Sequence, residues 1–258
     1  MSSFNDKGFV IKLVPLNEND KVVSVLSQKN GRINAVAKGI NKIKSRSAAS
    51  LDLLNNISFR AFQGKSNLDL ITEVRLIDDF HSLKTDLDII NLNLYVLEVI
   101  DKLIIGHEST QSIYELVSSY LNYHKEEQLS LIDRLKILIS FQFKILDNLG
   151  YTPLLDECVV CGEKFKEGEF RIASADNQIG YICGRHTGIA KQRNNIEDVI
   201  LKIQKYLLNH NLIAAKQLQI TPNQLKSLFT IQNLWIQNVM EKKINITDII
   251  NSILLKAI

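Results

Sequence analysis

The 258-residue sequence has no apolar run of the roughly eighteen residues that a membrane-spanning helix requires. Its N-terminal residues lack the basic start and apolar stretch of a secretory signal peptide. Only three cysteines are present, and all lie within one short stretch, which favours a reducing compartment. Hydrophobic residues make up 45% of the chain, enough for a substantial core. We therefore expect a cytoplasmic protein with one large domain or two ordinary ones.

The motifs of several enzyme classes are also missing. The sequence contains no H-E-x-x-H, no G-x-x-x-x-G-K-[ST] loop and no G-x-G-x-x-G. It has no internal repeat and no low-complexity linker. We expect a protein that is not an enzyme and does not hydrolyse nucleotides.

The cysteines form the most informative pattern in the chain. Cys158 and Cys161 are two residues apart, and Cys183 and His186 form a second pair after a gap of about twenty residues. This spacing is typical of a structural zinc site, because each turn can aim both of its side chains at one small cation. We predict one structural Zn²⁺ per chain, and we expect the glycines after the ligands, Gly162 and Gly184, to have positive φ.

Two other interpretations of the cysteines remain open. Cys158 and Cys161 can be a redox pair, but such a motif belongs in a βαβ pattern that the sequence lacks. A disulfide is the second alternative. For a zinc hydrolase the site would need an open coordination position, whereas four apparent ligands close it.

The small net charge of +3 conceals an asymmetry along the chain. Residues 21–65 contain nine basic residues and a single acid, Asp52, for a local charge of +8. Residues 81–258 have nineteen basic and twenty acidic residues, for a charge of −1. Such a field favours a polyanion partner, and we predict that it binds DNA. The predicted DNA-binding residues are Lys21, Lys29, Arg32, Lys38, Lys42, Lys44, Arg46, Arg60 and Lys65.

Residues 1–80 have the pattern of short strands. Five runs rich in β-branched and apolar residues lie between polar breaks, and Asn30-Gly31 is a strong hairpin signal between the second and third. Five antiparallel strands in this length suit an OB-fold β-barrel, a common oligonucleotide-binding domain. Phe9, Phe59 and Phe62 lie in these strands, and we expect them in the core rather than stacked on bases.

From residue 81 onward the hydrophobic period becomes helical. Residues 87–105 and 131–149 are long apolar segments, and Gly150 is a natural stop for the second. Thr221 and Gln224 form a capping box that opens a later helix. The predicted fold class is α+β. An OB-fold domain at 1–80 is followed by a mainly helical domain at 81–258, with a zinc-finger-like insert at about 150–190.

The chain resembles the family of the bacterial recombination mediator RecO from about residue 7 to 186. The resemblance rests on the order of several short motifs. They are Gly8-Phe9-Val10, the Glu18/Asp20 loop, Gly31-Arg32, Ala37-Lys38-Gly39, Ser45, Glu73 and Gly150-Tyr151-x-Pro153-x-Leu155-Asp156-x-Cys158-x-x-Cys161-Gly162. Family members that bind metal usually have Cys-x-x-Cys as the second pair, whereas this chain has Cys183-Gly184-Arg185-His186.

The resemblance implies a DNA repair and homologous recombination protein associated with the nucleoid. Members bind single- and double-stranded DNA, anneal complementary strands and engage a RecR-type mediator ring. They also bind the C-terminal tail of single-stranded DNA-binding protein and help to load recombinase onto coated strands. The alternative is a zinc-stabilised DNA-binding adaptor or transcription regulator without annealing activity. A strong preference for one duplex sequence would favour that alternative.

Overall fold

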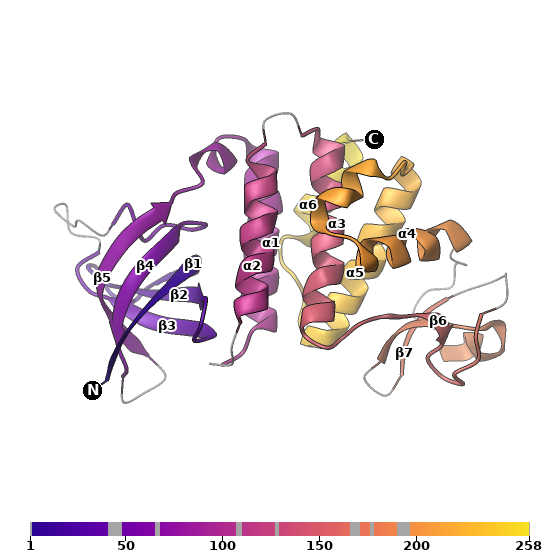
Figure 1. Cartoon of the computed structure of the whole chain (residues 1–258), viewed down its shortest axis with the longest axis horizontal. Coiled ribbons are helices and arrows are strands. Elements are labelled where there is room, and N and C mark those ends of the chain that lie inside the picture. Colours follow the sequence, from indigo (N-terminus) through magenta and orange to yellow (C-terminus); the bar gives the residue numbers. More distant parts are fainter. Residues whose placement is uncertain are drawn as a thin grey trace. The chain divides into compact units, whose positions relative to one another are not determined.

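The computed structural model describes residues 2–40, 48–64, 68–106, 110–126, 129–165, 171–175, 178–189 and 197–257 (Figure 1). The chain forms two compact units, residues 1–121 and 122–258. The first contains a β-barrel and two helices, and the second contains the remaining helices and a small sheet. Within the described residues, no helix combines the length and the apolar character that crossing a membrane would require.

Five strands close the barrel of the first unit in the order β1-β2-β3-β5-β4. Neighbours pair in antiparallel fashion except β3 and β5, which are parallel, and β1 is long enough to pair with both β2 and β4. This closed five-stranded barrel is the OB-fold that the sequence predicts. The strands are β1 (Ser3–Pro15), β2 (Lys21–Ser27), β3 (Arg32–Ala37), β4 (Asn56–Phe62) and β5 (Asp69–Asp78).

Side chains alternate between the two faces of each strand, and the inward-facing ones fill the barrel. Val23 and Val25 of β2 and Ile57 and Phe59 of β4 point into one apolar core, while the residues between them face outward. Gly8 is required where β1 crosses β2, because a Cβ there would lie 2.6 Å from the carbonyl oxygen of Leu26. The predicted hairpin is present as well, with Gly31 at a φ of 71°.

Two helices, α1 (Leu87–Leu103) and α2 (Gln111–His124), follow the barrel, and the first unit includes α1 and most of α2. Asp86 caps α1 by accepting a hydrogen bond from the Ile89 backbone nitrogen at 2.9 Å. The ring of Tyr114 on α2 lies 4.9 Å from that of Phe9. A short 3₁₀ turn, η1 (His81–Lys84), joins β5 to α1. These two helices therefore share a compact unit with the barrel.

The second unit is built around α3 (Leu131–Asn148), which is buried along most of its length. Gly150 ends α3 as expected, with a φ of 81° and its N–H donating to the Asp147 carbonyl at 3.0 Å. The predicted capping box at Thr221 and Gln224 is present. The other helical elements are α4 (Asp198–Asn209), η3 (Leu212–Gln217), α5 (Pro222–Met240) and α6 (Thr247–Lys256).

A three-stranded sheet interrupts the helices of this unit. Its strands β6 (Leu154–Cys158), β7 (Arg171–Ala175) and β8 (Gln178–Ile182) have the order β6-β8-β7, with β6 parallel and β7 antiparallel to β8. Gly180 allows β6 and β8 to approach, because a Cβ there would lie 2.5 Å from the carbonyl oxygen of Leu154. The sheet and the 3₁₀ turn η2 (Gly184–Ile189) form the zinc-finger-like module that the spacing predicts.

Candidate metal centre and nucleic-acid interface

The first pair of candidate ligands lies in a tight turn at the end of β6. The Cys158 N–H donates to the Glu163 carbonyl at 3.0 Å, and the Gly162 N–H donates to the Cys158 carbonyl at 2.8 Å. Gly162 has a φ of 68°, as expected for the residue after a ligand in such a turn. The reversal brings the Cys161 side chain back towards Cys158.

The second pair lies directly after β8. The His186 N–H donates to the Cys183 carbonyl at 3.0 Å, which folds the imidazole back over the thiol. Gly184 does not have the positive φ that we expected for it. The reason is that η2 begins at this residue, so the chain turns there in a right-handed 3₁₀ conformation and not in a left-handed one.

The four side chains meet at one point. The Sγ atoms of Cys158, Cys161 and Cys183 and a ring nitrogen of His186 all lie within 4.8 Å of one another. The Cys161 and Cys183 Sγ atoms are 4.0 Å apart, and the His186 Nδ1 is 3.6 Å from the Cys158 Sγ and 3.3 Å from the Cys183 Sγ. A tetrahedral zinc site with Zn–S near 2.3 Å requires S···S edges of about 3.8 Å and S···N edges of about 3.5 Å. The cluster can therefore hold a metal ion, and its size suits zinc.

The backbone around Cys158 favours its charged form. Burial alone would raise the pKa of this thiol, but N–H groups of Cys183, Val160 and Cys161 point at the sulfur and bring its pKa down to about 6. The Cys183 N–H lies 3.4 Å from the Cys158 Sγ. A thiolate is the form that binds a metal, so Cys158 is suited to be a ligand. Such closed coordination by four protein ligands supplies a cross-link, and a bound zinc would hold the two turns together.

The module joins the helices of its unit through Tyr181 on β8. Its side chain is fully buried, and its hydroxyl donates to the Gln204 Oε1 on α4 at 2.8 Å. Its ring packs edge-on against the indole of Trp235 on α5, with centroids 5.6 Å apart. Because Tyr181 is only two residues before Cys183, the metal cluster is closely tied to the helical core.

Those predicted DNA-binding residues that the structure describes do not form one patch. Lys21 and Lys38 are at one end of the barrel, since Lys21 pairs with Ala37, the residue before Lys38. Lys38 lines a surface hollow together with Glu18 and Asp20, so this end also carries negative charge. Lys42, Lys44, Arg46 and Lys65 lie outside the described residues.

Lys29 and Arg32 are at the opposite end, on either side of the β2–β3 turn. Lys29 is exposed, but Arg32 is engaged with α1. Its guanidinium lies 2.5 Å from the Asp101 carboxylate and donates to the Asp101 carbonyl at 2.8 Å. Lys12 pairs with the same carboxylate at 2.8 Å. Arg32 therefore has a structural partner within its own unit.

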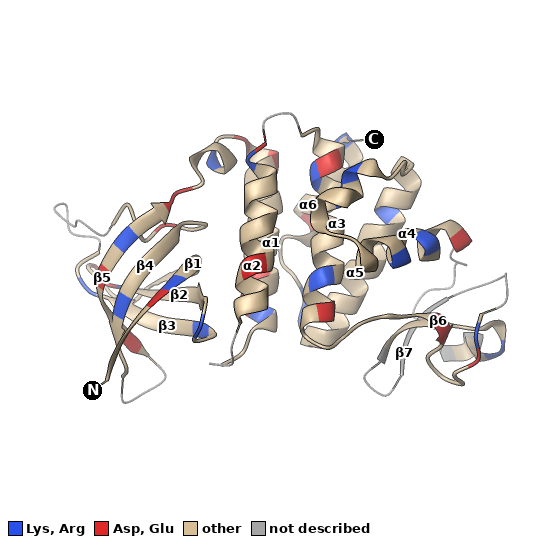
Figure 2. Ribbon diagram, in the orientation of Figure 1, with Lys and Arg blue, Asp and Glu red and all other residues tan. Residues whose placement is uncertain are grey.

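Arg60 lies on a third surface, the outer face formed by β1, β4 and β5. It pairs with Glu73 at 3.7 Å, and its guanidinium sits 5.8 Å from the centre of the Phe62 ring. Two basic residues that the sequence reasoning missed, Lys7 and Arg75, are exposed on the same face. Figure 2 shows Lys and Arg positions distributed over several barrel strands. Pairing the strands in register would have placed Lys7 and Arg75 near Arg60, because Lys7 and Arg75 both lie opposite Ser58, two residues before Arg60.

Comparison with known proteins identifies both halves of the chain. Residues 1–80 match the family model described as Recombination protein O N terminal, and residues 84–246 match Recombination protein O C terminal. Several curated proteins named DNA repair protein RecO are similar over most of their length. The protein from Alkaliphilus metalliredigens is 27% identical over 86% of this chain and 87% of its own. That from Acetivibrio thermocellus is 22% identical over 98% of each chain, and that from Clostridium novyi is 26% identical over 97% and 94%.

Proposed function

We propose that this chain is a recombination mediator which anneals complementary DNA strands. The premise is that the chain belongs to the RecO family of DNA repair proteins. The observation that carries the proposal is the pairing of a closed OB-fold barrel, rich in exposed basic residues, with a helical unit that has a Cys₃His cluster. OB-folds bind single strands by following the phosphate backbone with positive charge. A protein of this kind, working in the cytoplasm on the nucleoid, needs no catalytic centre.

Annealing by such a protein needs only simple physics. Two complementary strands repel each other through their phosphates, and a cationic surface reduces that repulsion. Base stacking and pairing then drive duplex formation, so no nucleotide has to be hydrolysed. Under the proposal, basic residues of the barrel bind single- and double-stranded DNA, among them the half-buried Lys21 and the exposed Lys29, Lys38 and Arg60. Sequence reasoning adds Lys42, Lys44, Arg46 and Lys65.

The protein partners in this proposal are a RecR-type mediator ring and the C-terminal tail of single-stranded DNA-binding protein. Such a tail is acidic and apolar, and it requires an apolar groove with basic residues at its rim. The helical unit is where we place its binding. In this account the protein loads recombinase onto strands that are coated with the binding protein.

The zinc has a structural role in the proposal. Cys158, Cys161, Cys183 and His186 would hold it, and the ion would keep β6, β8 and η2 together. The chemistry that it supplies is cross-linking, because a closed ligand set leaves no position for a substrate. Annealing therefore depends on zinc only through the integrity of the module.

Stopped-flow fluorescence with naked complementary oligonucleotides tests the annealing activity. Zinc-loaded protein should raise the annealing rate well above its spontaneous value without ATP, and the gain should fall steeply as salt rises. The control is an unrelated pair of strands, which should not associate. If the protein binds one duplex sequence tightly and does not raise the annealing rate, the mediator proposal is wrong. The chain would then be a DNA-binding adaptor or transcription regulator.

A further inference from the structure

The outer face of β1, β4 and β5 carries a row of basic and polar side chains that the register places side by side. Lys7 on β1 pairs with Ser58 on β4, and Ser58 pairs with Arg75 on β5. The next row is Asn5, Arg60 and Glu73. Because adjacent strands are about 4.8 Å apart, each row crosses roughly 10 Å of surface.

The side chains of these rows point away from the barrel interior. Ile57, Phe59 and Ala61 of β4 are buried in the core, so Ser58 and Arg60 between them face outward. Lys7, Arg60 and Arg75 are all exposed. Within residues 1–121, the described part of the chain therefore leaves this face accessible to a ligand.

The outer face of β2 and β3, which OB-folds commonly use for oligonucleotides, is less open at its hairpin end. Leu26 on that face is fully buried. Arg32 beside it is held by Asp101 of α1, and its side chain is only 20% exposed. The unit's own helix thus engages the basic residue that would otherwise serve a strand there.

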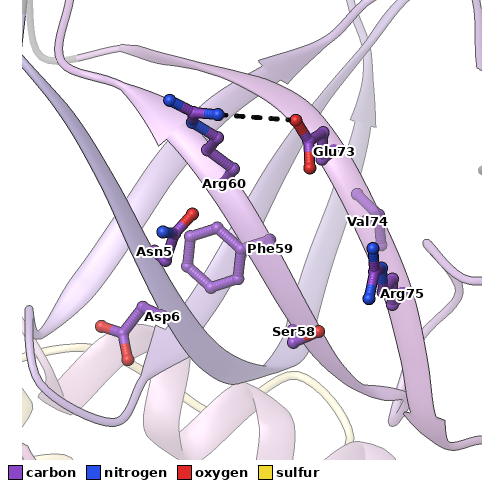
Figure 3. Close-up of a pocket in the computed structure, with 8 residues that line it drawn as sticks. All are labelled: Asn5, Asp6, Ser58, Phe59, Arg60, Glu73, Val74 and Arg75. Carbon is purple, nitrogen blue, oxygen red and sulfur yellow. Dashed lines mark ion pairs between the residues drawn. The ribbon is translucent and has the colours of Figure 1, made fainter.

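The β1–β4–β5 face is also hollowed. Figure 3 shows the eight residues that line this hollow, with Arg60 on β4 and Glu73 on β5 joined by an ion pair and with Arg75 further along β5. Asn5 and Ser58 add hydrogen-bonding groups that suit phosphate oxygens. Asp6, the other acid in the lining, is buried and accepts hydrogen bonds from Asn30 and the Lys7 backbone at 2.6 and 2.8 Å.

We propose that this face is where the barrel binds the phosphate backbone of single-stranded DNA, with Lys7, Arg60 and Arg75 contacting phosphates. The inference rests on the proposed function and specifies the location of its DNA site. Charge complementarity selects the occupant, since three exposed cations lie in adjacent rows with polar donors between them. Glu73 limits the site by pairing with Arg60, but an exposed pair of this kind is weak, and a phosphate can displace it.

The experiment measures fluorescence anisotropy of a labelled oligothymidine over a series of salt concentrations. The double variant Lys7→Ala/Arg75→Ala should bind about tenfold more weakly near 100 mM salt, and its log–log salt slope should fall by about 1.4, since each single-strand phosphate contact contributes about 0.7. Glu73→Gln should bind at least about twofold more tightly, because it frees Arg60.

The matched control is Lys226→Ala/Lys242→Ala, which removes the same charge from exposed positions of the helical unit. Its binding should stay within about twofold of the wild type. The conservative variant Lys7→Arg/Arg75→Lys should retain binding, which separates charge from any effect on the fold.

If the double variant keeps the wild-type affinity and salt slope, the face is not the contact surface, although the proposed function can stand with the site elsewhere. An equal loss of affinity in Lys226→Ala/Lys242→Ala would show that the effect comes from net charge alone, and it would overturn the proposed location of the DNA site. Failure of the wild-type protein to bind any single strand at low salt would instead overturn the proposed function itself.

Discussion

Removing one metal ligand should unfold the module while sparing the barrel. In Cys158→Ser the hydroxyl is a poor zinc ligand, and Cys158 is also the buried member of the cluster. Among the described residues, the cluster around the metal ligands buries Cys158, Val159 and Ile182, and Leu154, Phe165 and Cys183 pack against them partly buried. The three buried side chains contribute about 4.5–9 kcal/mol, at roughly 1.5–3 kcal/mol each. Structural zinc typically contributes about 10–16 kcal/mol, so a bound zinc would dominate the stability of the module.

Three readouts on the purified chain test this prediction. Elemental analysis should find one zinc per chain in the wild type and well under one in Cys158→Ser. In Cys158→Ser, the backbone amides of β6 and β8 should lose their protection against hydrogen exchange. Those of β1 to β5 should keep it, because these strands belong to a separate compact unit. Trp235, the single tryptophan, packs against Tyr181 and should report the change by fluorescence. His186→Ala should keep more metal than Cys158→Ser, since three thiolates remain.

The reasoning would be refuted by a Cys158→Ser protein that still binds one zinc with wild-type affinity. Full protection of β6 and β8 in metal-free wild-type protein would also contradict it, because the apolar core would then be sufficient alone.

Three further predictions concern polar groups that are buried or half-buried. Tyr181→Phe removes the hydrogen bond to the buried Gln204, and urea unfolding should show the second unit less stable by about 1–2 kcal/mol. Asp101→Ala leaves Arg32 without its carboxylate, and thermal unfolding should show a loss of about 2–3 kcal/mol, between the values for exposed and buried pairs. Burial is the main cause that lowers the pKa of His124 to about 3, and the positive charge of Arg134 adds to it. Between this pKa and the ordinary value of 6.5, the unfolded chain binds a proton at His124 that the folded chain does not. Stability should therefore fall by about 1.4 kcal/mol per pH unit from pH 6.5 towards pH 3, and His124→Gln should flatten this dependence.

Short-range patterns in the sequence were sufficient for most of the architecture. Two residues separate the ligands within each pair of the cluster, so local turn geometry alone brings each pair together. The strands of the barrel and the caps of α3 and α5 likewise depend on neighbouring residues. Helix α2 was not predicted, although Ile113, Val117 and Leu121 are buried at helical spacing. That signal was present in the sequence and was missed.

The proposed DNA surface was less accessible to sequence reasoning, because it depends on contacts between distant residues. The partner of Arg32 is Asp101, which lies sixty-nine residues further along the chain. Counting charge in a window of sequence excluded Lys7 and Arg75, whereas the register of three strands places them in one row. A charge count finds the sign of a surface, but only the strand order shows which charges share it.

The mediator role itself is tested most directly on coated strands. Complementary strands saturated with single-stranded DNA-binding protein should anneal faster when this protein is added without ATP. The same experiment with binding protein lacking its C-terminal tail should lose that acceleration, while naked strands anneal as before. Annealing of coated strands at the rate seen without this protein, under conditions where it binds naked DNA, would contradict the account.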